Sequence, residues 1–267
     1  MPQIPDDLVR SVAILLSGAG EPIGTAFVVE HRIVDEDFFD AFYLITCEHC
    51  VGNPVRARFS NGLSTEISPN DWRKPTTRDD VVAFEVTDLV APARSAIGSI
   101  NTGSVVKPGE PTFGIGTDLY MLGLLIDVQD IGQNLPIARF GNLSAFADDR
   151  VLMEQGNGVK RPCHLGDMRS RTGFSGSPVI GYVEFTGLDG HSNFQNRLFG
   201  VHSAQHSERI RVASENGYKA LDIPSSMTRI VPAWEVLGLI ETDQTFTDNQ
   251  ARRKREGRGL LGNTGGT

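Results

Sequence analysis

The chain has 267 residues, 39% of them hydrophobic, and a formal net charge of −8, so it can bury one sizeable core or two small ones. The acidic balance argues against a general nucleic-acid surface, because phosphate binding requires a basic face. No stretch approaches the roughly 18 apolar residues of a membrane span, and the acidic, polar N-terminus is unlike a signal peptide. We therefore expect a soluble, cytoplasmic protein that binds neither nucleic acid nor a membrane.

The cysteines stand at positions 47, 50 and 163. An odd and low number does not describe a disulfide framework. It fits a reducing compartment, in agreement with the cytoplasmic expectation.

Short β-like runs dominate the first half of the chain. They cover residues 11–16, 25–30, 41–46, 56–59, 63–67 and 81–86. Asn61 and Gly62, between the fourth and fifth runs, predict a hairpin because both residues tolerate positive φ. The segment after residue 90 is rich in small and turn residues, has little periodicity and predicts a linker.

The second half repeats this pattern. Strand-like runs cover residues 119–126, 137–140, 151–154, 177–183 and 198–203. Short strands at this spacing, separated by many of the 29 glycines and 14 prolines, predict β-barrels or sandwiches.

The C-terminal region differs in composition. Apolar residues recur at helical spacing from residue 230 to 239 and predict one short helix, with Ser225 or Ser226 as the N-cap unless Pro232 delays its start. From about residue 245 the chain becomes charged and then Gly-rich, which predicts a disordered tail. The basic cluster at 252–255 reads as a solvated part of that tail.

The stretch GFSGSP, residues 173–178, directly precedes an apolar run. Its glycines, serines and proline could simply form a turn. Alternatively, the turn presents Ser175 as a nucleophile, and its glycines let backbone N–H groups approach a reacting carbonyl.

Six histidines are candidate bases, and His49 follows directly on the run that ends at residue 46. A strand end provides the fixed position that a catalytic base needs. Asp80 leads into the run at 81–86, where an acid can be partly buried and orient an imidazole. Asp79 is the alternative acid.

The order His49, Asp80, Ser175, each beside a predicted strand, resembles the trypsin/chymotrypsin-like serine proteases, especially the bacterial branch with HtrA-type domains. The matching stretches are residues 23–29, 44–51, 79–84, 118–124, 138–144, 173–179 and 199–204. The resemblance implies an all-β fold of two six-stranded antiparallel β-barrels. It places one barrel in residues 1–100, a second barrel and the terminal helix in 101–245, and the tail in 246–267.

The resemblance also implies the roles of single residues. His49 would be the general base, oriented by Asp80, and Ser175 would form an acyl-enzyme. The backbone N–H groups of Gly173 and Ser175 would form the oxyanion hole, and Ser203 would line the substrate edge. The implied substrate is a protein or peptide, and no cofactor is implied.

Three residues depart from the family pattern. Phe174 stands where digestive and clotting members carry an aspartate that pairs with a new N-terminus, so we expect no activation by N-terminal cleavage. Ser177 replaces the commoner second glycine. Glu48 precedes the histidine where small residues are usual and could perturb it. We also expect no peptide-binding module of the HtrA kind after the catalytic region.

Substrate preference rests on two further positions. His202 lies where glutamyl- and glutamine-specific relatives place a pocket histidine, and Arg169 lies at the expected pocket floor. Together they favour an acidic or glutamine side chain before the scissile bond, through charge-assisted hydrogen bonds.

Four alternatives stay open. Cys47, His49, Cys50, Cys163 and His164 hold the right atoms for zinc, although their spacing lacks a second Cys-x-x-Cys. An α/β-hydrolase is disfavoured by the serine at the last elbow position and by the chain order. The chain could also be an inactive, protease-like binding module, or a protease that is latent until an activating protein partner orders its loops.

Overall fold

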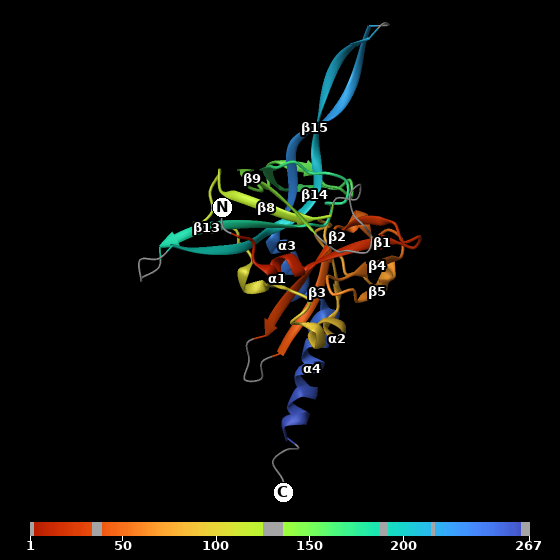
Figure 1. Cartoon of the computed structure of the whole chain (residues 1–267), viewed down its shortest axis with the longest axis vertical. Helices are drawn as coiled ribbons and strands as arrows, with labels where there is room; N and C mark the ends of the chain where they lie inside the picture. The colour runs from red at the N-terminus through yellow and green to blue at the C-terminus, as the bar shows by residue number, and fades with distance from the viewer. Residues whose placement is uncertain (1–2, 34–38, 125–135, 187–191, 215–216, 263–267) are drawn as a thin grey trace.

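The computed structural model describes residues 3–33, 39–124, 136–186, 192–214 and 217–262 (Figure 1). Two antiparallel β-sheets follow one another along the chain, and two helices end it. Among the helices of these residues, none is both long and apolar enough to cross a membrane.

The first sheet has six strands along one path, in the order β5-β4-β1-β2-β3-β6, and a short β7 that pairs in parallel with β2. Its strands are β1 (Val12–Ser17), β2 (Pro22–Ile33), β3 (Phe39–Thr46), β4 (Val55–Arg58), β5 (Ser64–Ile67), β6 (Val82–Glu85) and β7 (Ile100–Asn101). Short helices precede, connect and follow these strands: α1 (Asp6–Arg10), η1 (Glu48–Cys50), η2 (Pro69–Asp71), α2 (Thr87–Val90), η3 (Ala91–Ala93) and η4 (Thr102–Ser104). Strands β5 and β6 stand at the two ends of this path. Arg73, which follows β5 in the chain, forms an isolated β-bridge with Ala83 in β6 and so brings these ends closer together.

The second sheet closes into a six-stranded barrel in the order β12-β15-β14-β13-β8-β9. Its strands are β8 (Asp118–Gly123), β9 (Ile137–Ala145), β12 (His164–Asp167), β13 (Pro178–Thr186), β14 (Ser192–Ser214) and β15 (Gly217–Pro232). A separate hairpin of β10 (Leu152–Glu154) and β11 (Lys160–Pro162) extends from it. The predicted all-β class with two six-stranded antiparallel β-barrels is confirmed as two curled, antiparallel sheets, the first of which adds the short parallel strand β7.

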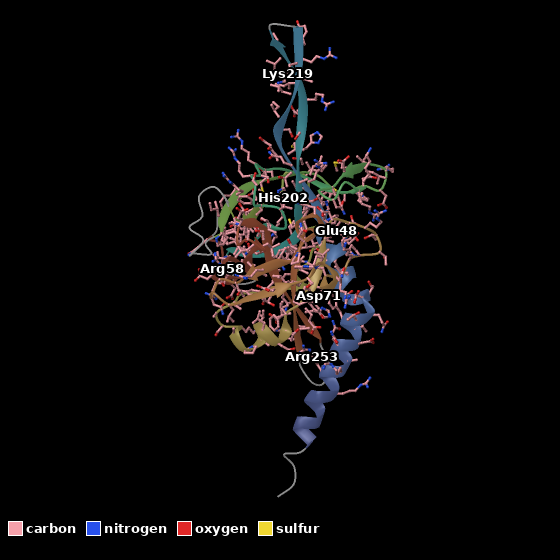
Figure 2. The ribbon with its side chains drawn as sticks, turned by 90° about the vertical axis from the view of Figure 1, so that its right-hand side faces the viewer. Glu48, Arg58, Asp71, His202, Lys219 and Arg253 are labelled. Atoms are coloured by element: carbon pink, nitrogen blue, oxygen red, sulfur yellow. The ribbon has the colours of Figure 1, made fainter. Side chains whose placement is uncertain are left out.

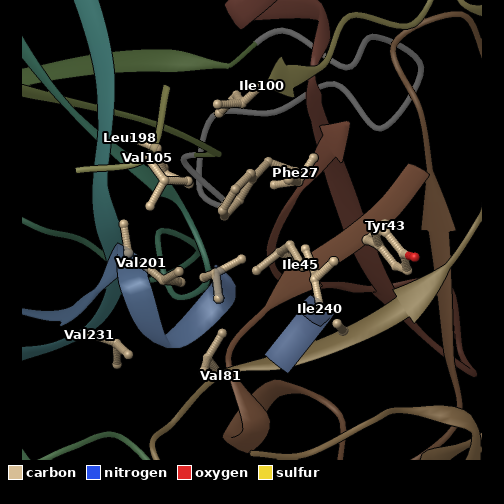
Figure 3. Close-up of a cluster of buried hydrophobic side chains, with 14 of the residues drawn as sticks. Phe27, Tyr43, Ile45, Val81, Ile100, Val105, Leu198, Val201, Val231 and Ile240 are labelled. Atoms are coloured by element: carbon tan, nitrogen blue, oxygen red, sulfur yellow. The ribbon is translucent and has the colours of Figure 1, made fainter. Parts of the chain in front are cut away.

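Three large apolar clusters and a small one of Ile14, Leu16 and Leu124 form the core of the described residues. One fills the first sheet and one fills the barrel. The third lies between them and contains Phe27 and Ile45 of the first sheet, Leu198 and Val201 of β14, and Ile240 of the C-terminal helix (Figure 3). Strands β1, β2 and β3 thus bury both faces and read as continuous apolar runs, whereas β4 and β5 alternate between buried and exposed residues.

The predicted hairpin at Asn61-Gly62 is present between β4 and β5. Gly62 has a φ of 86°, and the Leu63 N–H donates to the Asn61 side chain at 3.0 Å. The last paired residues are Arg58 and Ser64, so the connecting loop is longer than that of a two-residue hairpin.

The first C-terminal helix, α3, spans Ala233–Thr242 and begins after Pro232. The predicted N-caps, Ser225 and Ser226, are wrong, because β15 continues through both residues to Pro232. Pro232 delays the start of the helix, which was the alternative expected from the sequence, because a proline inside a helix removes a backbone hydrogen bond.

The tail predicted to be disordered is helical instead: α4 spans Gln244–Gly262. Its Phe246 packs on Tyr43 with ring centroids 4.7 Å apart, and Gln250 donates to the Tyr43 hydroxyl at 2.7 Å. Arg253, within the basic cluster, forms ion pairs with Glu85 and Asp88. Charged composition alone misses this helix, because partners on the first sheet stabilise it.

Strands β14 and β15 extend far beyond the predicted run at 198–203 and form a projecting two-stranded hairpin, which we call the arm (residues 207–214 and 217–224; Figures 1 and 2). Ile210 pairs with Leu221, and Glu208 pairs with Ile223. Directly paired residues share a face, so these aliphatic side chains lie on one face of the arm.

Candidate active site

His49 lies in η1, directly after β3 ends, and its imidazole is hydrogen-bonded to a buried carboxylate. His49 Nδ1 is 2.8 Å from Asp80 Oδ2, and the His49 backbone N–H donates to Asp80 Oδ1 at 3.1 Å. Asp80 is fully buried, whereas the His49 side chain is 28% exposed. The pair therefore fixes one ring nitrogen inside the protein and leaves the rest of the ring partly accessible.

Ser203 and Gly156, both from the second unit, lie beside the Asp80 carboxylate. The Ser203 hydroxyl donates to Asp80 Oδ2 at 2.6 Å, and it accepts the Gly156 N–H at 2.8 Å. The bond from Ser203 to the Asp80 carboxylate therefore joins the two units.

Gln155 and Gly156, between β10 and β11, were missed by the sequence analysis. Gln155 is buried; its Oε1 accepts the Asp80 N–H at 2.5 Å, and its Nε2 donates to Asp79 Oδ1 at 2.9 Å. A Cβ on Gly156 would overlap His49 Nδ1 and Asp80 Oδ2. A glycine is required there by close approach, and no local motif marks that need.

Both candidate acids have distinct places. Asp80 contacts His49, whereas Asp79 is bound by Gln155 and by Arg161, whose Nε lies 3.1 Å from Asp79 Oδ2. Asp79 thus helps to hold the segment that carries Asp80, and neither of these two interactions involves His49.

Ser175 sits on a tight turn between two glycines of positive φ, Gly173 at 101° and Gly176 at 85°. The Thr25 N–H donates to the Ser175 carbonyl at 2.9 Å, and the Gly176 N–H donates to His202 O at 2.9 Å. Positive φ at these positions favours glycine. The turn is therefore held from both sheets.

Phe174 anchors this turn. Its side chain is fully buried in the core of the barrel, and its N–H donates to Arg171 O at 3.1 Å. An apolar side chain here fixes the Ser175 turn by packing, where an aspartate would need a buried charged partner.

A cleft of about 760 Å³ is lined by every predicted site residue except Asp80, which is buried beneath it. Its lining includes His49, Gly173, Ser175, Arg169, His202 and Ser203. Arg169 is exposed at its edge. His202 is buried, and its Nε2 lies 2.5 Å from the Ser170 hydroxyl.

Burial on its own would lower the pKa of His49, but the hydrogen bonds and charges of Asp80 and Cys50 outweigh it and raise that pKa to about 10. Burial would raise the pKa of Asp80, yet the hydrogen bond and charge of His49 lower it. The two groups therefore form a charged pair. In contrast, burial and the charge of His49 lower the pKa of His202 to about 4, so this ring is neutral.

The carboxylate of Glu48, which precedes His49 in the sequence, binds other residues than His49. Lys74 Nζ lies 2.8 Å from its Oε1, and Asn157 donates to its Oε2 at 2.8 Å. Burial opposes the change, but these two hydrogen bonds lower the pKa of Glu48.

The residues considered as alternative zinc ligands do not come together as a set. Among the described residues, only Cys47, His49 and Asp80 bring potential ligand atoms within 4.8 Å of one another. The Cys47 thiol donates to His202 O at 3.1 Å. His164 instead packs between aromatic rings, with its Nδ1 accepting the Ala147 N–H at 2.9 Å.

No protein-family model and no curated protein sequence matches this chain. Several solved structures resemble it, including two of the same protease. One is the inactive form of the protease Rv3671c, with a TM-score of 0.48 and 16% identity over 88% of this chain and 90% of that chain. The other is a serine-to-alanine mutant of Rv3671c from M. tuberculosis H37Rv, with a TM-score of 0.46 and 16% identity over 88% and 87% of the chains. Likenesses this distant say nothing about the reaction of this chain, which has to be inferred from its own site.

Proposed function

We propose that this chain is a serine endopeptidase that hydrolyses peptide bonds of a protein or peptide substrate. The observation that carries the proposal is the hydrogen-bonded pair of His49 and Asp80, with Ser175 on a tight turn in the same cleft. In this proposal His49 takes the Ser175 proton as the hydroxyl oxygen attacks the scissile carbonyl, and later gives that proton to the leaving amine. Asp80 holds the imidazole in position and stabilises its charged form.

Two backbone donors support the same chemistry. Within the described residues, no hydrogen bond is recorded from the N–H of Gly173 or of Ser175. The N–H between them, on Phe174, is used by the turn itself. Two free donors on one turn could stabilise the oxyanion that forms on the substrate carbonyl, which is usually the largest single contribution to such catalysis.

The proposed preference is for an acidic or glutamine side chain before the scissile bond. Arg169 supplies an exposed cation at the cleft edge, and His202 supplies a neutral imidazole behind it. A library of peptides that differ only at this residue tests the preference. Faster cleavage after arginine, lysine or a large aromatic residue would contradict it.

A fluorophosphonate probe tests the reaction itself. We expect it to label the wild type and a Ser64→Ala control, which alters an exposed hydroxyl of β5, and to leave Ser175→Ala and His49→Ala unlabelled. Labelling that persists in Ser175→Ala would assign the nucleophile to another residue and overturn the proposal.

A second candidate is a protease that is latent until a protein partner activates it. The raised pKa of His49 favours this alternative, because a protonated imidazole cannot accept the Ser175 proton at neutral pH. Labelling that is absent at pH 7 and present at pH 10 would show that protonated His49 blocks the reaction at neutral pH, which is the state that an activating partner would have to change. Absence at both values in a folded protein would leave the inactive binding module as the better description.

A further inference from the structure

A second cavity, of about 610 Å³, shares no lining residue with the catalytic cleft. Phe113, Phe146 and Trp234 form its aromatic walls. These walls are fixed from behind, since Phe113 and Phe146 both pack on Phe199. This volume is typical of a small-ligand site.

His164 lies directly behind two of these walls. Its ring packs edge-on against Trp234 at 5.0 Å and against Phe146 at 5.8 Å. Its Nε2 is buried and has no hydrogen-bond partner among the described residues. Burial lowers the pKa of His164 to about 3, so the ring adds no positive charge to the cavity.

The charged lining of the cavity is predominantly acidic. It consists of the carboxylates of Asp79, Glu110, Asp149 and Glu235 and the cations of Lys107 and Arg161. Arg161 is engaged by Asp79, and Glu110 is paired with Arg197 of β14 at 2.8 Å. In the described part of the chain, Glu235 and Asp149 have no recorded salt bridge.

Glu235 sits in the first turn of α3 beside Trp234, and its Oε2 accepts a hydrogen bond from the Thr77 hydroxyl at 3.2 Å. Burial and the charge of Asp79 raise the pKa of Glu235 more than the Thr77 hydrogen bond and the charge of Arg161 lower it. A cation placed between these carboxylates would relieve their repulsion.

Aromatic faces next to carboxylates suit a flat cation with an apolar stem. A guanidinium stacks on aromatic rings and donates two parallel hydrogen bonds to a carboxylate. We propose that this cavity is a second binding site, which takes an arginine side chain presented by a peptide or protein, stacked on Trp234 and paired with Glu235.

The same site is coupled to the catalytic pair through buried groups. Asp79 lines the cavity and accepts from Gln155, and Gln155 accepts the N–H of Asp80. The charge of Asp79 acts on Glu235 across the cavity, so a cation paired with Glu235 changes the surroundings of Asp79 and therefore alters the bond that positions Asp80. Occupancy of the cavity thus adjusts the His49–Asp80 pair.

Trp234 provides a direct readout of binding, because the chain has two tryptophans and the other, Trp72, is buried in the core of the first sheet. The experiment uses ¹⁹F NMR of the full chain labelled with 5-fluorotryptophan, with each signal assigned by Trp72→Phe or Trp234→Phe. N-acetyl-arginine N-methylamide is the probe, and the citrulline analogue, which is uncharged and nearly the same shape, is the control ligand.

We expect the arginine probe to shift the Trp234 signal saturably and to leave the Trp72 signal unchanged. Glu235→Gln should weaken binding at least tenfold, whereas Glu241→Gln, on the same helix but outside the cavity, should not. No saturable shift, an equal response to the citrulline analogue, or unchanged binding by Glu235→Gln would each overturn the binding site.

The coupling has its own readout, the ring-proton signals of His49. Saturating probe should shift them in the wild type, and Gln155→Leu should abolish that shift while the Trp234 response remains. A Trp234 response without any change at His49 would overturn the coupling. These measurements need no turnover, so their failure is distinct from failure of the proposed peptidase activity.

Discussion

At the residue scale, the site depends on how closely second-unit groups approach His49 and Asp80. Gly156 leaves no room for a side chain, and Ser203 and Gln155 bind the carboxylate and the backbone of Asp80. Each of these contacts spans more than 45 positions of the sequence. They explain why a histidine and an aspartate that are individually unremarkable form a pair.

We expect Gly156→Ala to displace the His49 ring and to lower the rate of fluorophosphonate labelling by about 10²-fold or more, since a shift of about 1 Å in a catalytic group has effects of this size. Gly52→Ala is the matched control, because nothing lies within 4 Å of a Cβ at that position. Equal labelling rates in the two variants would show that the ring can move aside without loss.

The raised pKa of His49 predicts that labelling becomes faster as the pH rises from 7 toward about 10, since only the neutral imidazole can accept a proton. Asp80→Asn removes the main group that raises this pKa, so the His49 ring protons should then titrate at lower pH. A labelling rate that is flat above pH 7 would contradict the raised pKa.

The same pKa has a consequence for stability. His49 binds its proton more tightly in the folded protein than in the unfolded chain. Its contribution to the free energy of unfolding is therefore complete below the unfolded pKa of 6.5 and is lost as the pH rises through the folded pKa of about 10. The lowered pKa of Asp80 acts at the other end, where stability is lost as the pH falls below the usual range of aspartate.

At the element scale, the helices after the barrel return to the first sheet. Phe246 is buried against Tyr43, and Arg253 pairs with Glu85 and Asp88. Helix α4 directly follows α3 and packs on the first sheet, so it links the second unit to the first.

Phe246→Ala should lower the free energy of unfolding by about 3 kcal/mol, the usual cost of removing a buried phenylalanine. Asp248→Ala, on the exposed side of the same helix, should change it by less than about 0.5 kcal/mol. Urea denaturation followed by circular dichroism measures both, and equal small effects would mean that α4 does not stabilise the fold.

The arm contributes to the fold differently. Two strands without a third layer are marginally stable on their own, and Ile210, Val212, Leu221 and Ile223 are all more than a third exposed. We expect amide hydrogens of Arg209–Val212 to exchange much faster than those of Val201 and Ile230 inside the barrel. Comparable protection in the isolated monomer would indicate that other residues cover the arm.

At the scale of the whole molecule, the two sheets share one apolar core. Consecutive residues of β2 alternate between it and the interior of the first sheet: Phe27 and Val29 belong to the shared core, Ala26 and Val28 to the interior. This alternation follows from the two-residue period of a strand. The units therefore cannot separate without exposing a large apolar surface.

We accordingly predict a single cooperative unfolding transition. Trp72 reports on the first sheet and Trp234 on the helix that follows the barrel, so variants that keep one tryptophan each should melt at the same temperature. Two separate transitions would show that each sheet folds independently.

The amino-acid sequence by itself determined the all-β class, the positions of most strand centres and the Asn61-Gly62 hairpin, because apolar periodicity and turn chemistry are local properties. It also indicated His49, Asp80 and Ser175, through their order and their places beside strands. Only the tertiary structure decided that Gln155 and Gly156 complete the surroundings of Asp80, that β14 and β15 project as an arm, and that residues 244–262 form a helix. These features arise from contacts between distant segments, and no local pattern of residues encodes such contacts.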